Sequence, residues 1–251
     1  MQHIVYNLLN PYNQDPYPGG ISPWLDVRTP DLDELVDKLE AQTHRRFIKT
    51  HLPLDGLPYY GNVKYIVVSR DVRDVFMSLW NHYSSYSSRA YDSFNNTLGR
   101  KGEPQPHCPE DIRVFWEMWI TRGWFDWESE GYPFWSNMRH VQTWWDFRSL
   151  TNILFLHYNH LKRDPESEIL RIAQYLDFDV PEGSIENILN MVSLKTRRRN
   201  AVEKERDDEG EPFMIGGARS FFHKGTNNRW RDVMKCEDLS LYDEVADREL
   251  S

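Results

Sequence analysis

Apolar and polar residues follow one another along the chain in blocks that predict short strands separated by helices. Three runs have the length of strands, at residues 45–51, 63–70 and 152–158. The strongest of them is "VKYIVVSR" at 63–70, which is β-branched and apolar on both faces, as a strand inside a parallel sheet should be. Strands that alternate with helices predict an α/β fold with a parallel central sheet flanked by helices.

Apolar residues at helical spacing occupy most of the remaining chain. One helix is expected to start with Thr29 as its N-cap and Pro30 at its first helical position. A second, "DVRDVFMSLWNHY", directly follows the strand at 63–70. Further helices are expected at residues 1–9, 111–124, 133–147, 164–178 and 181–192 and near the C-terminus. The polar stretch 84–110 is predicted to be a long loop, and the basic stretch 195–206 a mobile surface segment.

Composition and charge narrow the class of protein. The chain has 251 residues, a length that fits one large domain or two small ones, and we expect a single domain, 1–251. Its formal charge of −9 argues against nucleic-acid binding, and the run "KTRRRN" is too short to change that expectation. The sequence shows no membrane-spanning run and no signal peptide, and its two cysteines are isolated, which together predict a cytoplasmic protein. No His or Cys cluster has metal-ligand spacing, so no metal is predicted.

Polar residues stand where each predicted strand ends, which is where parallel sheets bind ligands. Lys49 and His51 alternate along an extended segment, so their side chains should face the same way. A histidine can serve as a general base, and a lysine can stabilise developing negative charge. Arg70 ends the second strand, Ser78 follows two helical turns later, and the pair would suit a phosphate. Each pair, taken alone, also fits ordinary surface residues.

A third polar group lies near the C-terminus, in "FFHKGTNNRW" at 221–230. His223 and Lys224 precede Gly225, and a glycine after basic residues lets backbone N–H groups approach an anion closely. An ordinary turn would explain the same residues.

Together, the order and spacing of these pieces resemble the PAPS-dependent cytosolic sulfotransferase family. Its members transfer a sulfuryl group from 3′-phosphoadenosine 5′-phosphosulfate (PAPS). The resemblance rests on "KTHLPL" at 49–54, "VKYIVVSRDVRDVFMSLWNHY" at 63–83, "GYPFWSNMRHVQTWWDF" at 131–147, "ILFLHYNHLKRDPESEILRIAQYL" at 153–176 and "FFHKGTNNRW" at 221–230. These segments cover most of the chain in family order, and they imply a P-loop NTP-hydrolase-like sulfotransferase fold.

The resemblance implies a catalytic role for two residues and a phosphate-binding role for two more. His51 falls on the general base that takes a proton from the acceptor hydroxyl or amine. Lys49 falls on the lysine that stabilises charge around the transferring group. Arg70 and Ser78 fall on the pair that binds the 3′-phosphate of the nucleotide.

The remaining implied nucleotide contacts include departures from the family pattern. Tyr158 falls on the tyrosine near the adenine, and Leu194 stands where an aromatic residue often stacks on that base. His223, Lys224 and Gly225 fall on the motif that closes over the 3′-phosphate, with His223 in place of the usual arginine. "NNRW" replaces the usual Gly-Asp-Trp ending of that motif. These differences imply weaker nucleotide binding.

The N-terminus is the largest departure. The family opens with a strand and a glycine-rich loop of the type Lys-Ser-Gly-Thr-Thr-Trp, followed by a helix. "MQHIVYNLLN" corresponds to that helix, so we expect an N-terminally truncated domain without the first strand and the phosphosulfate-binding loop. Two explanations stay open: a start that falls too late in an active enzyme, or a naturally inactive relative.

The sequence therefore predicts a sulfotransferase that moves a sulfuryl group from PAPS to a hydroxyl or amine of a small-molecule acceptor. The alternative is a catalytically inactive, nucleotide-binding relative that acts as a binding protein. A nucleotide kinase is disfavoured, because no strand ends in a metal-binding aspartate and a 3′-phosphate pair has no role there. The identity of the acceptor and the formation of a homodimer both stay open.

Overall fold

The structure, a computed structural model, describes residues 1–15, 20–26, 32–98, 100, 102–205 and 210–250. The chain divides into two units of noncontiguous segments. Unit 1 contains Met1–Thr50, Ser87–Pro104 and Asn159–Phe222. Unit 2 contains His51–Tyr86, Gln105–Tyr158 and His223–Ser251. The first boundary falls between Thr50 and His51, within one of the segments singled out by the sequence.

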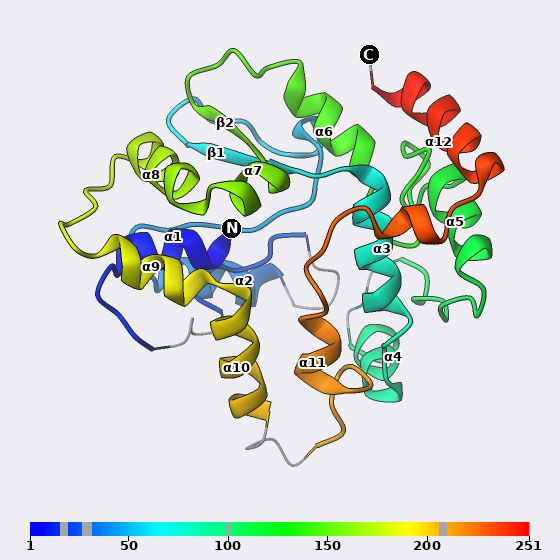
Figure 1. Ribbon diagram of the computed structural model, residues 1–251, viewed down its shortest axis with the longest axis horizontal. Coiled ribbons are helices and arrows are strands. Elements are labelled where there is room, and N and C mark those ends of the chain that lie inside the picture. The colour runs from blue at the N-terminus through cyan, green and yellow to red at the C-terminus, as the bar shows by residue number, and fades with distance from the viewer. Residues whose placement is uncertain (16–19, 27–31, 99, 101, 206–209, 251) are drawn as a thin grey trace. The chain divides into compact units, whose positions relative to one another are not determined.

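A parallel pair of strands runs through unit 2 (Figure 1). β1 (Tyr65–Ser69) pairs with β2 (Ile153–His157), with Val67 opposite Phe155. Both strands and their parallel pairing were expected, so the α/β class with a parallel sheet is confirmed. The expectation that β1 is covered on both faces is wrong, because Val67 is 3% exposed while the next residue, Val68, is 39% exposed. Successive side chains point to opposite faces of a strand, so one face of β1 is packed more fully.

Helices complete unit 2. They are α3 (Val72–Tyr83), α5 (Ile112–Thr121), α6 (Asn137–Trp145) and α12 (Cys236–Glu249), with short 3₁₀ helices η1 (Leu54–Gly56) and η2 (Arg229–Asp232). Phe76 of α3 is buried against Trp116 and Trp119 of α5, with ring centroids 4.9 and 5.6 Å away. Aromatic side chains bury large areas, and these three belong to the core of unit 2. The helix after β1 is thereby held in place by its buried face.

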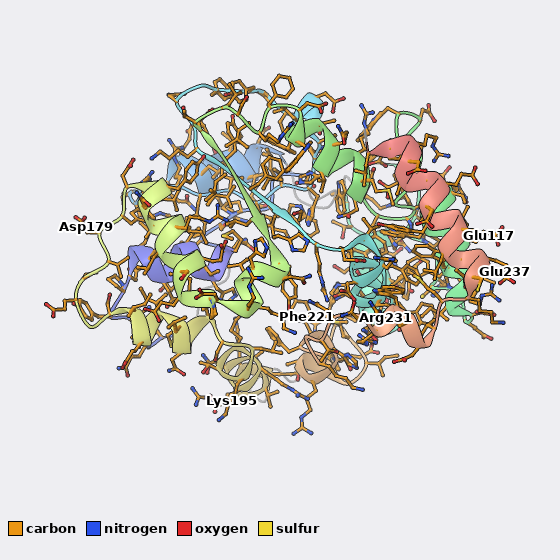
Figure 2. All side chains as sticks on the ribbon, turned by 45° about the horizontal axis from the view of Figure 1, so that its top comes forward. Glu117, Asp179, Lys195, Phe221, Arg231 and Glu237 are labelled. Atoms are coloured by element: carbon orange, nitrogen blue, oxygen red, sulfur yellow. The ribbon has the colours of Figure 1, made fainter. Side chains whose placement is uncertain are left out.

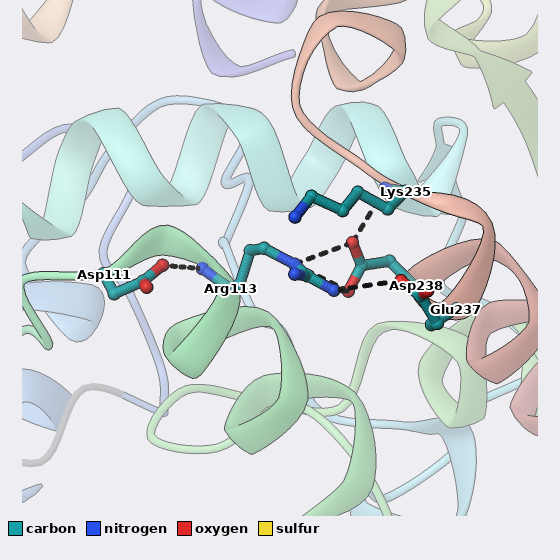
Figure 3. A network of polar contacts seen from close by, with 5 residues as sticks. All are labelled: Asp111, Arg113, Lys235, Glu237 and Asp238. Atoms are coloured by element: carbon teal, nitrogen blue, oxygen red, sulfur yellow. Dashed lines mark hydrogen bonds and ion pairs between the residues drawn. The ribbon is translucent and has the colours of Figure 1, made fainter.

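A polar network joins α5 to α12 in unit 2 (Figure 3). The guanidinium of Arg113 donates from Nε to Asp238 Oδ2 over 3.1 Å. The same carboxylate caps α12, because it accepts a hydrogen bond of 2.8 Å from the backbone N–H of Lys235. At the other end of the network Asp111 caps α5 and accepts from the backbone N–H of Arg113 at 2.8 Å. The network therefore fixes the first turns of two helices at once.

Unit 1 is mainly helical. Its helices are α1 (Gln2–Leu9), α2 (Leu32–Glu40), α4 (Ser88–Asn95), α8 (Pro165–Leu176), α9 (Ile185–Val192), α10 (Leu194–Glu205) and α11 (Gly217–Phe221), and α7 (Tyr158–Arg163) starts at the last residue of unit 2. α1 packs along α9 (Figure 1). α8 begins as expected, with Pro165 in its first turn and Asp164 accepting from the N–H of Ser167 at 3.1 Å. In the part of the chain that the structure describes, no helix combines the length and apolar character needed to cross a membrane.

Three expectations about secondary structure need correction. Residues 45–51 form no strand: only Lys49 pairs, in an isolated parallel bridge with Trp24. The polar stretch 84–110 includes the helix α4. Residues 195–205, for which a mobile surface segment and no helix was expected, lie in the helix α10, where the exposed side chain of Lys195 is labelled in Figure 2. The expected helix start at Thr29 and Pro30 lies outside the described residues.

Candidate functional site

Arg70 lies at the carboxyl end of β1, and the contacts of its guanidinium define the centre of the candidate site in unit 2. Its Nη2 donates to Asn227 Oδ1 over 2.9 Å and to the Thr226 carbonyl over 3.4 Å. The Cζ atom lies 4.4 Å from the centroid of the Tyr158 ring, which follows β2. Two strand ends and the C-terminal segment 223–230 therefore meet at this arginine, as the sequence predicts.

The carboxylates that follow Arg70 in sequence bond elsewhere. Asp71 accepts from Arg73, with Nη2 to Oδ2 at 2.7 Å, and from the backbone N–H groups that start α3. Burial alone would raise the pKa of Asp71, but the hydrogen bonds from Arg73 hold it below its ordinary value. Asp74 accepts from the backbone N–H of Asn228 over 2.7 Å. Neither forms the local ion pair with Arg70 that would have explained this arginine as an ordinary surface residue.

One face of α3 meets the C-terminal segment at two points. Asp74 and Asn81 are seven residues apart, which puts them on the same face of the helix, with Ser78 between them. Asp74 accepts from Asn228, and Asn81 Oδ1 accepts from Arg229 Nη2 over 3.1 Å. The Ser78 side chain is exposed. Ser78 therefore lies on the helix face that the C-terminal segment lines.

Two residues of the C-terminal segment have a left-handed backbone. Gly225 has a φ of 60°, a left-handed conformation that glycine adopts without strain. Asn228 is left-handed too, with a φ of 65°, a conformation that asparagine tolerates better than most residues. Lys224 is exposed. The Nδ1 atom of His223 lies 3.3 Å from Arg229 Nη1.

His51 is held by residues that lead into α6 or lie on it. Its imidazole stacks on Trp135, with ring centroids 4.9 Å apart. The next residue, Leu52, accepts at its carbonyl from His140 Nδ1 over 2.9 Å, so the proton of that ring lies on Nδ1. The backbone N–H of Leu54 donates to Thr143 Oγ1 over 3.0 Å. The segment that carries His51 is thus fixed at several successive positions.

The remaining predicted residues, Lys49 and Leu194, belong to unit 1. The Lys49 ammonium lies 4.0 Å from the centroid of the Trp24 ring. Burial lowers the pKa of Lys49, while the charge of Asp26 raises it. Leu194 is the first residue of α10 and is 44% exposed. Seven of the nine residues singled out by the sequence therefore lie in unit 2, and these two lie in unit 1.

Four residues at the candidate site carried no functional assignment from the sequence: Asn81, Trp135, Asn227 and Arg229. Asn81 follows Ser78 by three positions, so the helix face of Ser78 could have indicated it. Asn227 and Arg229 belong to the segment "FFHKGTNNRW". The last residues of this segment differ from the family pattern, and the sequence alone indicates no role for them. No sequence signal distinguishes Trp135 from neighbouring aromatic residues. Among the residues that the structure describes, no group of three or more His, Cys, Asp or Glu side chains could hold a metal ion.

Comparison with known proteins assigns the family. The model of the sulfotransferase domain matches residues 12–251, so this chain belongs to the sulfotransferase family. It is similar to sulfotransferase 1A1 of Rattus norvegicus, with 26% identity over 224 residues that cover 88% of this chain and 68% of the relative. It is also similar to a glycolipid sulfotransferase of Mycobacterium tuberculosis, with 27% identity over 249 residues that cover 90% of this chain and 73% of the relative.

Solved structures confirm the fold. The mouse sulfotransferase SULT7A1 complexed with PAP matches with a TM-score of 0.66 at 20% identity, over 98% of this chain and 78% of that protein. Retinol dehydratase in a complex with retinol and PAP matches with a TM-score of 0.69 at 22% identity, over 99% of this chain and 76% of that protein. The predicted sulfotransferase fold is therefore confirmed.

Proposed function

We propose that this chain transfers a sulfuryl group from PAPS to a hydroxyl or amine of a small-molecule acceptor, with His51 as the general base. One observation carries the proposal, the environment of Arg70 at the end of β1. Its guanidinium contacts Tyr158 and the C-terminal segment. The carboxylates of Asp71 and Asp74, which follow it in the sequence, form hydrogen bonds with other residues. Membership of the sulfotransferase family supports the type of reaction. The matching structures of SULT7A1 and retinol dehydratase are complexes with PAP, the desulfated form of the donor.

Arg70 fits a nucleotide phosphate. Its Nε is buried and has no hydrogen-bond partner among the described residues, and its hydrogen bonds to Thr226 and Asn227 both use Nη2. A guanidinium has five N–H donors, so several stay available for a dianion. Phosphate oxygens would satisfy these donors with charge-assisted hydrogen bonds, the strongest type. The exposed hydroxyl of Ser78 would supply a further donor from α3.

Other residues would complete the nucleotide site. We assign Lys224 and the left-handed Gly225 to closing over the 3′-phosphate, since a backbone of this conformation presents N–H groups to an anion. We assign Tyr158 to the adenine region, and Leu194 and His223 to further nucleotide contacts. The assignments of Tyr158, Leu194 and His223 rest on the sequence resemblance.

Catalysis would consist mostly of positioning and charge stabilisation. The bound donor would supply the sulfuryl group: the acceptor oxygen or nitrogen bonds to its sulfur in line as the bond from sulfur to the 5′-phosphate oxygen breaks, and the desulfated nucleotide leaves. The imidazole of His51, held by its stack on Trp135, would accept the proton of the acceptor hydroxyl or amine as the nucleophile attacks. Lys49, two positions earlier in the chain, would stabilise negative charge on the transferring group. Its role rests on the sequence resemblance.

The acceptor would be a small organic molecule. Retinol dehydratase matches this chain in complexes with retinol and with androsterone, and both of these molecules carry a hydroxyl group. By likeness we propose a hydroxyl-bearing acceptor first and an amine second, and a protein that works in the cytoplasm.

Turnover of ³⁵S-labelled PAPS with a panel of phenols, alcohols and amines tests this proposal. We expect the label to appear in at least one acceptor and the desulfated nucleotide to accumulate in equal amount. Tight binding of the desulfated nucleotide without transfer to any acceptor would overturn the enzyme assignment and favour a nucleotide-binding protein.

A further inference from the structure

Arg229 lies beside the residues proposed to bind the 3′-phosphate, although no role was assigned to it. It starts η2, and its guanidinium makes two hydrogen bonds within unit 2. Nη2 donates to Asn81 on α3 over 3.1 Å, and Nη1 lies 3.3 Å from His223 Nδ1. Asn81 is three positions beyond Ser78, so the guanidinium contacts the same face of α3 that presents the Ser78 hydroxyl.

The hydrogen bond between Arg229 and His223 can run in one direction only. A guanidinium only donates hydrogen bonds, so His223 Nδ1 must be the acceptor. An imidazolium has a proton on both ring nitrogens and accepts nothing. In this geometry His223 Nδ1 accepts from Arg229, so the imidazole orients the guanidinium.

Arg229 and Arg70 also share one electrostatic environment. Burial, followed by the charge of Arg70, lowers the pKa of Arg229, while the Asp74 carboxylate raises it. Asp74 already accepts from the backbone N–H of Asn228. The positive charges of Arg70 and Arg229 repel each other, and the Asp74 carboxylate beside them already accepts a hydrogen bond. A bound phosphate dianion would therefore stabilise both guanidiniums.

We propose that Arg229 is a second arginine ligand of the nucleotide's 3′-phosphate, and that it acts together with Arg70 and Ser78 while His223 orients it. This inference rests on the proposed function, since it names a ligand for the same nucleotide. Its contacts with Asn81 and His223 use two of the five guanidinium donors of Arg229, so three stay available and it can bind a phosphate oxygen at the same time.

Calorimetric titration with two nucleotides tests the inference without any turnover. Adenosine 3′,5′-bisphosphate carries the 3′-phosphate, and adenosine 5′-phosphate lacks it. We expect Arg229→Gln to weaken binding of the bisphosphate about tenfold or more, roughly 1.4 kcal/mol, and to leave binding of the monophosphate within about twofold of the unaltered chain. Arg229→Lys should fall between the two, because lysine keeps the charge but lacks the planar fork.

Two further variants sharpen the test. The double variant His223→Arg, Arg229→Gln again has one guanidinium at the two positions that contact each other. We expect it to recover most of the lost affinity for the bisphosphate. Arg231→Gln is the matched control, because Arg231 is an exposed arginine of the same short helix whose guanidinium lies 5.2 Å from the Trp230 ring centroid (Figure 2). Both nucleotides should bind this control as they bind the unaltered chain.

The outcomes separate two kinds of failure. If Arg229→Gln keeps the full preference for the bisphosphate, or loses affinity for both nucleotides equally, the role of Arg229 is wrong while the proposed function stands. If the unaltered chain shows no preference for the bisphosphate, both the inference and the proposed nucleotide site are overturned.

Discussion

His51 stacks on Trp135, with ring centroids 4.9 Å apart and ring planes inclined by 24°. The contact matters because a general base works only when its nitrogen is held within hydrogen-bond reach of the proton that it removes. Stacking restricts the plane of the imidazole, while the hydrogen bond between Leu52 and His140 restricts the backbone beside it. Trp135 is therefore a positioning residue for the proposed base.

Replacing this tryptophan should impair the chemical step more than binding. For Trp135→Ala we expect kcat to fall about tenfold or more with little change in KM for PAPS. The reason is that His51 would no longer be held in position, and proton transfer to a misplaced general base is much slower. Trp135→Phe should recover most of the rate, since it restores an aromatic face. Steady-state kinetics that separate kcat from KM for PAPS would check this.

Trp145→Ala provides the control. Trp145 is 44% exposed and packs edge-on against Phe155, with centroids 5.3 Å apart. It should lower stability without changing kcat. Equal kinetic losses in Trp135→Ala and Trp145→Ala would show that neither ring acts through His51.

Glu130 predicts a pH-dependent stability. Its carboxyl is fully buried and accepts hydrogen bonds from the Ser136 hydroxyl and, over 2.8 Å, from the backbone N–H of Met138. Burial raises the pKa of Glu130 from 4.5 to about 7, even though these hydrogen bonds lower it. Between those values the folded chain binds a proton that the unfolded chain has released, so stability falls as pH rises from about 4.5 to 7 and changes no further above that range.

Urea unfolding between pH 5 and 8 measures this contribution. Relative to Glu130→Gln, we expect the unaltered chain to lose roughly 3 kcal/mol across the range, at about 1.4 kcal/mol for each pKa unit. Glu117→Gln, which alters an exposed carboxyl on α5, is the matched control and should leave the pH dependence unchanged (Figure 2). Parallel stability curves for the unaltered chain and Glu130→Gln would contradict the expectation.

The network between α5 and α12 gives a third prediction (Figure 3). Asp238 caps α12 and is buried, so Asp238→Ala should lower the free energy of unfolding by about 1–2 kcal/mol. Glu237→Gln changes the neighbouring carboxylate, whose side chain is 78% exposed, and should change stability by less than about 0.5 kcal/mol. Thermal unfolding of both variants checks this, and an equal loss in the two would show that the cap is not the source.

Secondary structure could be predicted from the sequence where the pattern of apolar residues within a segment determines it. Residues 63–70 and 152–158 are continuous apolar runs, and both contain strands of the sheet. The segment 45–51 failed because a strand also needs a partner along its length, and only Lys49 pairs. The stretch 195–205 was misjudged by its charge, although lysine, arginine and glutamate are good helix formers and the segment forms α10.

The candidate site could be predicted only where a side chain stands at the end of an element. Arg70 ends a recognisable strand, and Gly225 occupies a position where backbone conformation limits the choice of residue. Arg229 could not be predicted, because its partners Asn81 and His223 are brought to it by the packing of η2 on α3. Trp135 could not be predicted either, because packing brings it against His51, which is far from it in the sequence.

The identity of the catalytic base is the point on which the proposed mechanism depends. The most direct measurement is kcat for sulfuryl transfer by His51→Asn and by the unaltered chain, with calorimetric binding of adenosine 3′,5′-bisphosphate as the control for folding. We predict that the variant binds this nucleotide unchanged while kcat falls about 10²–10⁴-fold. A variant that transfers the sulfuryl group within a few-fold of the unaltered rate would contradict the mechanism.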